Sequence, residues 1–245
     1  MPSLNQQKNI NFCFVKYGEE VQGRPINHWI EPLCEPIKEY CNDVKFWCLT
    51  DDNRDLPDYI NTIPLTNEDI HLHIHWNKIK FFDPSFIKAQ PNDETIIVDI
   101  DMEWNKNPAP VIEYPIKSKE FVSMNRWWRD DDMPISGNFY KFKSHDFDFI
   151  QNVYMESFQH WQEHFSFKYN LLPKFGEQYF VYECVKTYNV TLQPAEWCMK
   201  TNPTNYPLYA ERFKKETGKD YYDCWDEAIW HYRNVRRDEE YDKKT

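Results

Sequence analysis

Two carboxylates that directly follow a strand-like run are the strongest chemical signal in the sequence. Residues 95–98 are all β-prone, and Asp99 and Asp101 come next, separated by one residue. Such a run predicts a buried strand, which we expect to continue through Asp101. Side chains at i and i+2 of an extended chain point to the same side, so these carboxylates would present hard oxygen ligands together. That donor set suits Mg²⁺ or Mn²⁺ carrying a phosphate; the alternative is a solvated acidic turn.

Other polar residues could join this site, although each also has a plainer structural interpretation. Lys78 could neutralise a departing diphosphate, or it could be an ordinary lysine at a helix start. Ser136 and Asn138 precede a predicted strand, where small polar residues would let a ligand approach the backbone, or would form a simple turn. Glu177 and Gln178 begin a predicted helix, so they could reach a sugar hydroxyl or only stabilise the helix dipole.

Several histidines and a run of aspartates are weaker indications of a metal site than Asp99 and Asp101 are. His71, His73 and His75 alternate and would share one side of an extended segment, as zinc ligands could. We expect no structural zinc site there, because such a site needs further ligands and a second shell. His231 lies in an apolar run, where a histidine is either a ligand or a packed core residue. Residues 130–132 are three aspartates, which we interpret as a solvated loop in preference to a second metal site.

Composition narrows the classes of function. The chain has 245 residues, a net charge of −11 and only five glycines, and it contains no Gly-rich phosphate-binding motif. An acidic surface argues against non-specific nucleic-acid binding, which depends on Lys and Arg. Seven cysteines without a CxxC pair predict buried free thiols in a reducing compartment. With no apolar leader and no membrane-length run, we expect a soluble cytoplasmic protein without a transmembrane segment.

The periodicity of apolar residues predicts one compact α/β domain over residues 1–235. Residues 236–245 are expected to form a charged, disordered tail. A strand, a helix and a second strand at the N-terminus suggest a right-handed unit with parallel strands. The expected strands are 10–15, 44–49, 60–65, 95–101, 121–124, 139–142 and 190–193, the expected helices are 29–40, 147–167, 176–186 and 207–215, and 225–232 could be either.

The order of these segments resembles that in glycosyltransferases of the GT-A fold, especially glycogenin-like, family 8-like enzymes and related bacterial and viral sugar transferases. The most specific pair is the Asp-x-Asp strand together with the upstream Trp-Asn-Lys. The matching segments span most of the chain: residues 14–18, 46–52, 76–78, 97–101, 136–142, 176–178 and 229–232.

This resemblance implies a Rossmann-like GT-A domain with a central mixed, mainly parallel sheet, and it implies roles for individual residues. Asp99, Asp101 and His231 would bind Mn²⁺ or Mg²⁺. Glu177 and Gln178 would contact the transferred sugar as catalytic residues, with Glu177 standing where the family usually has Asp. The residues that would bind the nucleotide-sugar donor are Val15, Lys16, Tyr17, Asp51, Asp52, Lys78, Ser136 and Asn138.

Together, the residues and the resemblance predict a metal-dependent glycosyltransferase. It would transfer a sugar, expected to be a hexose, from a nucleotide sugar such as a UDP-sugar to a glycan or glycoconjugate acceptor. Retention of configuration follows from the family 8 likeness alone. Two alternatives remain open: a nucleotidyltransferase on a similar α/β sheet, and a non-catalytic glycan-binding module.

Overall fold

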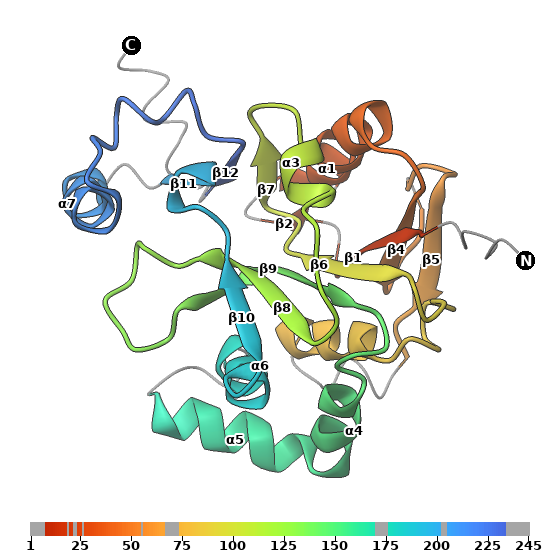
Figure 1. Ribbon diagram of the computed structural model, residues 1–245. Coiled ribbons are helices and arrows are strands. Elements are labelled where there is room, and N and C mark those ends of the chain that lie inside the picture. The colour runs from red at the N-terminus through yellow and green to blue at the C-terminus, as the bar shows by residue number, and fades with distance from the viewer. Residues whose placement is uncertain are drawn as a thin grey trace, which may run out of the picture.

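A seven-stranded sheet forms the centre of the molecule (Figure 1). The computed structural model describes residues 8–18, 20–21, 24–25, 27–54, 56–66, 74–169, 176–201 and 205–233. The strand order is β10-β8-β9-β6-β1-β4-β5. The strands are β1 (Ile10–Lys16), β4 (Val44–Thr50), β5 (Ile60–Pro64), β6 (Glu94–Val98), β8 (Glu120–Asn125), β9 (Ile135–Lys143) and β10 (Asn189–Leu192). Only β9 runs against its neighbours, so the sheet is mixed but mainly parallel.

Two smaller sheets complete the strands of the described residues. One has the order β11-β12-β7, formed by β11 (Cys198–Thr201), β12 (Trp230–Arg233) and β7 (Met102–Trp104). The other pairs β2 (Glu20–Val21) with β3 (Arg24–Pro25). The helices are α1 (Asn27–Tyr40), η1 (Ile74–Phe82), α3 (Ala109–Ile112), α4 (Phe149–Glu156), α5 (Phe158–Lys168), α6 (Glu177–Val185), η2 (Ala195–Trp197) and α7 (Tyr206–Thr217).

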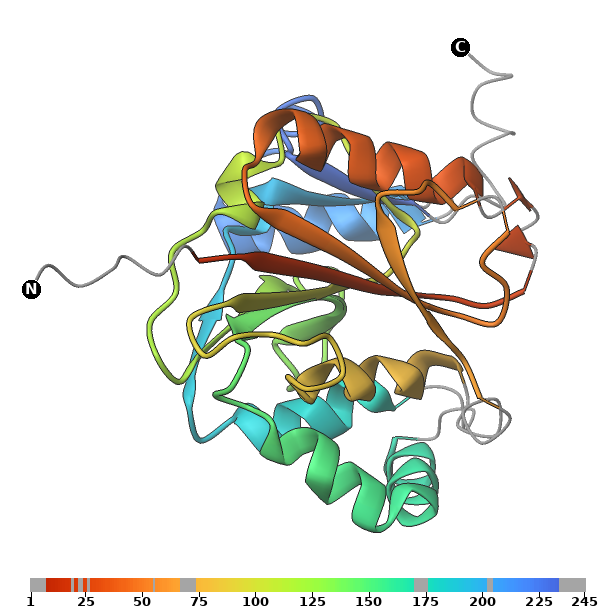
Figure 2. The same ribbon diagram turned by 90° about the vertical axis from the view of Figure 1, so that its right-hand side faces the viewer.

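Helices cover both faces of the central sheet, and each face has its own apolar core. Figure 2 shows α1 on one side of the sheet and η1, α4 and α5 on the other. Side chains alternate along the strands: Phe12 and Phe14 of β1 pack into the core beneath α1, whereas Cys13 packs into the opposite core. Because both faces of the sheet are buried, the sequences of its central strands are continuous apolar runs.

The structure confirms the first predicted unit and corrects several boundaries. Strand β1 pairs in parallel with β4, as the strand-helix-strand pattern predicts. The strand expected over residues 95–101 ends at Val98, and the predicted helix over residues 147–167 is broken at Ser157, whose extended φ interrupts it. Residues 105–115, whose prolines predict a loop, contain the short helix α3. His71, His73 and the expected tail lie outside the described residues. None of the helices in the described part of the chain has the length and apolar character of a membrane span.

Candidate functional site

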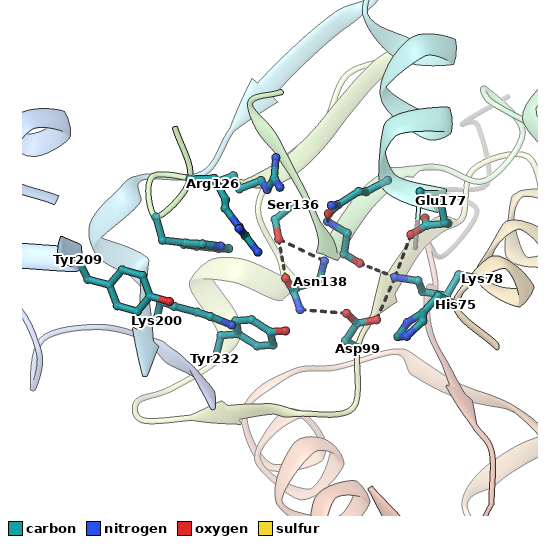
Figure 3. Close-up of a pocket in the computed structure, with 15 residues that line it drawn as sticks. His75, Lys78, Asp99, Arg126, Ser136, Asn138, Glu177, Lys200, Tyr209 and Tyr232 are labelled. Atoms are coloured by element: carbon teal, nitrogen blue, oxygen red, sulfur yellow. Dashed lines mark hydrogen bonds and ion pairs between the residues drawn. The ribbon is translucent and has the colours of Figure 1, made fainter. Parts of the chain in front are cut away.

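A pocket of about 220 Å³ lies beyond the carboxyl end of β6, where open α/β sheets bind their ligands. Figure 3 shows Asp99, Lys78 and Glu177 on one side of it, and Lys200, Tyr209 and Tyr232 on the other. The lining residues are His75, Lys78, Asp99, Arg126, Trp128, Arg129, Ser136, Gly137, Asn138, Gly176, Glu177, Gln178, Lys200, Tyr209 and Tyr232.

The carboxylate of Asp99 is held in place from two sides. The Nζ atom of Lys78 donates to Oδ1 at 2.9 Å, and Nδ2 of Asn138 donates to Oδ2 at 2.9 Å. Asn138 is in turn fixed by the Ser136 hydroxyl, which donates to its Oδ1 at 2.6 Å. The strand β9 therefore positions Asp99, because Ser136 and Asn138 alternate to the same side of that strand.

Lys78, which lies on η1, links that helix to three other elements at the floor of the pocket. Its ammonium group is buried, lies 3.2 Å from Oε2 of Glu177, and donates to the carbonyl oxygen of Gly137 at 2.8 Å. Burial alone would lower the pKa of Lys78, but the negative charges of Asp99 and Glu177 outweigh burial and raise it above its ordinary value. The lysine is therefore charged, and it binds η1, β6, β9 and α6 together.

Two glycines let the start of α6 pack closely, Gly137 against β9 and Gly176 against α5 and η1. A β-carbon at position 137 would lie 3.2 Å from Cβ of Gln178 and 3.3 Å from Oε2 of Glu177, and the Gly137 N–H donates to Oε1 of Gln178 at 3.2 Å. Gly176, the residue before α6, has a φ of 125°, which other residues rarely adopt. A β-carbon there would meet Phe165 at 3.1 Å and Trp76 at 3.2 Å. The glycines thus place Glu177 and Gln178 at the pocket.

The carboxyl group of Glu177 titrates near neutral pH. Burial raises its pKa to about 7; the ammonium of Lys78 opposes this rise, and the charge of Asp99 adds to it. The phenol of Tyr140 also faces this carboxyl.

Replacing Glu177 with glutamine should change stability in a pH-dependent way. The folded-state pKa of about 7 lies above the unfolded value of about 4.3, so the folded wild type binds an extra proton between these values. The wild type therefore loses stability as the pH rises through this window. The free energy of unfolding of Glu177→Gln, relative to wild type, should increase by about 2 kcal/mol between about pH 5.5 and about pH 8 in urea titrations. A difference that does not vary with pH would contradict the assignment.

Asp101 lies in the turn after β6, so the strand expected to continue through Asp101 ends before both carboxylates. The negative charge of Asp99 nevertheless acts on Asp101. Burial raises the pKa of Asp101 to about 7, the negative charge of Asp99 raises it further, and Lys200 opposes both. Two carboxylates that repel one another, both with oxygen donors, form a donor set that fits a divalent cation.

His231 is the expected metal ligand that the structure does not bring to the pocket. It alternates with Trp230 and Tyr232 on β12, so its ring points to the opposite side of that strand from the pocket-lining Tyr232. Its Nε2 lies 3.1 Å from the carbonyl oxygen of Trp225, and its ring packs 4.6 Å from the Trp225 ring. Within the described residues, no three His, Cys, Asp or Glu side chains gather where they could hold one metal ion.

The position of His231 predicts a structural role. Replacing it with alanine should remove the contacts with Trp225 and a buried ring, and should lower the unfolding free energy by about 2–4 kcal/mol. Affinity for Mn²⁺ should stay within about twofold, since the ring does not face the pocket. Thermal melts and Mn²⁺ titrations on the same variant check both statements. A large loss of Mn²⁺ affinity with an unchanged melting temperature would restore the ligand assignment.

Five of the eight residues expected to bind the nucleotide-sugar donor lie at the same edge of the sheet but do not line this pocket. Val15, Lys16 and Tyr17 lie at the carboxyl end of β1, next to the end of β4, where Asp51 and Asp52 follow. The carboxylate of Asp51 accepts the Gly18 N–H at 3.0 Å, and Asp52 pairs with Arg54 at 2.5 Å. Nζ of Lys16 donates to the Asp52 carbonyl oxygen. These contacts stiffen the two strand ends beside the pocket.

Several lining residues carried no usable sequence signal. Arg126 and Arg129 were visible only as neighbours of three aspartates, and Arg126 pairs with Asp131. Lys200 and Tyr209 reach the pocket only because β11 and α7 fold over the sheet edge. Burial lowers the pKa of Lys200 to about 8, against the opposing charge of Asp101.

Solved structures with a similar architecture include glycosyltransferases. The apo-form glycosyltransferase GlyE of Streptococcus pneumoniae TIGR4 superposes with a TM-score of 0.59 at 12% identity, covering 94% of this chain and 55% of that one. The chain thus spans about half the length of GlyE. The galactosyltransferase LgtC, solved with donor and acceptor sugar analogues, gives 0.57 at 10% identity, covering 91% and 87%. A glycosyltransferase involved in glycosylation of the major capsid of PBCV-1 gives 0.54 at 13% identity, covering 96% and 98%.

At these identities the likeness concerns the fold. No protein-family model matches the sequence, and no curated protein matches it. The narrower likeness to glycogenin therefore stays a prediction. The mixed sheet, the helices on both faces and the pocket beyond β6 agree with the fold expected from the sequence. The chain has the GT-A fold, which it shares with these glycosyltransferases.

Proposed function

We propose that the protein is a metal-dependent glycosyltransferase that transfers a sugar from a nucleotide sugar to a glycan or glycoconjugate. The observation that carries this proposal is the convergence of Asp99, Lys78, Asn138, Glu177 and Gln178 on one pocket at the carboxyl edge of a GT-A sheet. Three of these side chains form one bonded network around Asp99. A UDP-sugar donor, a hexosyl group and retention of configuration rest on the family 8 likeness and belong to the same proposal.

Asp99 and Asp101 would hold Mn²⁺ or Mg²⁺, because their carboxylates, which are close enough for the charge of Asp99 to act on Asp101, supply the hard oxygens that these ions prefer. When bound, the ion would act as a Lewis acid on the departing diphosphate. Lys78 orients the Asp99 carboxylate by its ion pair at 2.9 Å. Asn138 fixes the other carboxylate oxygen. These contacts leave part of the Asp99 carboxylate facing the pocket, since its side chain remains 26% exposed.

Glu177 and Gln178 would bind the transferred sugar from the opposite side of Lys78. Their helix begins at the pocket, and the missing side chain of Gly137 leaves room for both. A buried carboxyl and an amide are suited to orient sugar hydroxyls by hydrogen bonds, which fixes the anomeric carbon relative to the acceptor.

All seven cysteines are free and five are buried, which supports a reducing, cytoplasmic location.

Product analysis with a panel of nucleotide sugars tests the proposal. The protein is incubated with each donor, with Mn²⁺ or with EDTA, and free nucleoside diphosphate and pyrophosphate are both quantified. Mn²⁺-dependent release of nucleoside diphosphate supports the proposal. The sugar is then transferred either to an acceptor or, more slowly, to water. Release of pyrophosphate would show the nucleotidyltransferase alternative, and donor binding in thermal-shift assays without any release would show a non-catalytic binding module.

A further inference from the structure

A second cavity adjoins the pocket beyond β6. Its volume is about 410 Å³, against about 220 Å³ for that pocket. Arg126 and Arg129, from the connection between β8 and β9, line both cavities, so the two meet at these side chains. Because the Arg129 side chain is exposed, a chain-like ligand that starts in the first pocket can continue past it into the second cavity.

One face of α7 forms a wall of this second cavity. The α7 residues that face it are spaced by three or four positions, which places them on one side of the helix: Leu208, Glu211, Arg212 and Lys215. Two hydrogen bonds join α7 to the opposite wall. Nη1 of Arg212 donates to the Trp128 carbonyl oxygen at 2.5 Å, and Nδ2 of Asn125 donates to Oε1 of Glu216 at 2.8 Å. The walls of the cavity are therefore fixed relative to each other.

The charges that line the second cavity balance one another. Four lining side chains are basic and four are acidic. Arg126 pairs with Asp131, and Arg212 and Glu216 bond to the opposite wall. In the described part of the chain, the charged lining residues whose side chains have no such partner are two acids and two bases: Asp130, Glu211, Arg129 and Lys215. The pocket beyond β6 is lined instead by four basic and two acidic side chains. Charge complementarity thus favours an anionic ligand in the first pocket and a ligand without net charge in the second cavity.

The second cavity also offers the groups that bind a neutral sugar chain. Its carboxylates accept hydrogen bonds, and its guanidinium and ammonium groups donate them, so the lining can contact hydroxyl groups in both roles. Leu208 is 42% exposed and adds an apolar surface to the same wall, against which the C–H face of a sugar ring can pack. A ligand that is uncharged, rich in hydroxyl groups and partly apolar is an oligosaccharide.

We infer that the acceptor is a neutral oligosaccharide whose chain extends from the pocket beyond β6 past Arg129 into the second cavity. This inference rests on the proposed function. The sugar that receives the transferred group lies in the first pocket, and the following sugars of the chain contact Glu211, Lys215 and Leu208 of α7. A single sugar cannot reach both cavities, so binding depends on chain length.

Hexasaccharide binding tests this inference without any need for turnover. Isothermal titration uses maltohexaose, cellohexaose and mannohexaose as neutral probes, hexagalacturonate as an acidic probe, and glucose and mannose as single sugars. At least one neutral hexasaccharide should bind wild type, about tenfold or more tightly than its single sugar does, because only the chain reaches α7.

A double variant and a matched control place that binding in the second cavity. Glu211→Ala combined with Lys215→Ala leaves the net charge unchanged and should weaken hexasaccharide binding about tenfold or more, the loss expected for hydrogen bonds to two charged groups. Lys214→Ala is the control, because Lys214 is the exposed neighbour of Lys215 on the same helix and does not line the cavity. It should bind as wild type does.

The outcomes separate this inference from the proposed function. The inference is wrong if no neutral hexasaccharide binds, or if hexagalacturonate binds more tightly than all of them. Transfer to a hexasaccharide with the same acceptor KM in wild type and in the double variant would also overturn it, while the proposed function would stand. Binding that depends on Glu211 and Lys215, without release of nucleoside diphosphate from any nucleotide sugar, would leave a site for neutral glycans and remove the proposed function.

Folding of the double variant is checked by its melting temperature, which should equal that of wild type because both side chains are exposed. If it does not, Leu208→Ala tests the same wall. That change should weaken hexasaccharide binding at least about threefold, since it removes apolar surface from the cavity, and unchanged binding would count against the inference.

Discussion

Replacing Asp99 with asparagine should lower sugar transfer by about a thousandfold or more while leaving the fold intact. The substitution keeps the shape of the side chain and removes its negative charge. On the proposed function, that charge binds the divalent cation that stabilises the leaving group, and loss of such electrostatic stabilisation costs about 10²–10³ or more in rate. Lys78 retains its contacts with Glu177 and Gly137, so the buried ammonium does not lose all its partners. Donor turnover in saturating Mn²⁺ measures the effect.

The matched control is Asp58→Asn, which removes one carboxylate charge from an exposed position away from the pocket. Its turnover should equal that of wild type. Mn²⁺ affinity should fall in Asp99→Asn and not in Asp58→Asn, which separates loss of a ligand from a general change in surface charge. Wild-type turnover by Asp99→Asn would show that the reaction does not depend on this carboxylate, and the central assignment would then be wrong.

The sequence predicts the strands of the central sheet well because each is bounded by a physical signal. Residues of β1 and β6 are apolar on both faces, and polar residues follow each strand at the sheet edge. The boundary of β6 was wrong by three residues, since the apolar pattern of residues 95–101 does not show that pairing with β9 ends at Val98. Where a strand ends depends on its backbone hydrogen bonds to the partner strand, and the local sequence pattern does not identify that partner.

In the candidate site, too, residues in elements with a local sequence pattern were predicted, and residues placed by tertiary packing were not. Asp99, Lys78, Asn138 and Glu177 were predicted, and the structure brings all four to one pocket. Each lies in or directly after an element with a recognisable sequence pattern. Lys200 was not predicted, because it lies in the short strand β11, which pairs with β12 in a small sheet whose strands come from distant parts of the sequence. The side of β12 that His231 occupies is likewise set by packing against Trp225.

Replacing Lys78 with methionine should destabilise the protein by about 3–5 kcal/mol at about pH 8. Methionine fills a similar volume, but Glu177 then remains buried without its cation, and removal of one partner of a buried ion pair has this cost. Asp99 also loses its ion pair, although its partial exposure limits that contribution. Urea unfolding monitored by tryptophan fluorescence gives the free energy. The exposed-surface variant Lys214→Met, with no buried pair to break, should stay within about 0.5 kcal/mol of wild type.

The pH dependence and a double variant identify the cause of that loss. At about pH 5.5 the Glu177 carboxyl, whose pKa of about 7 rises further without Lys78, is neutral, so Lys78→Met should then cost less than at about pH 8. Adding Glu177→Gln should recover part of the loss at about pH 8, because no buried charge is left unpaired, and the non-additivity measures the coupling of the pair. Equal losses at both pH values, with additive effects in the double variant, would mean that Lys78 stabilises the fold only by packing. In that case the ion pair with Glu177 would not be what joins η1 to α6.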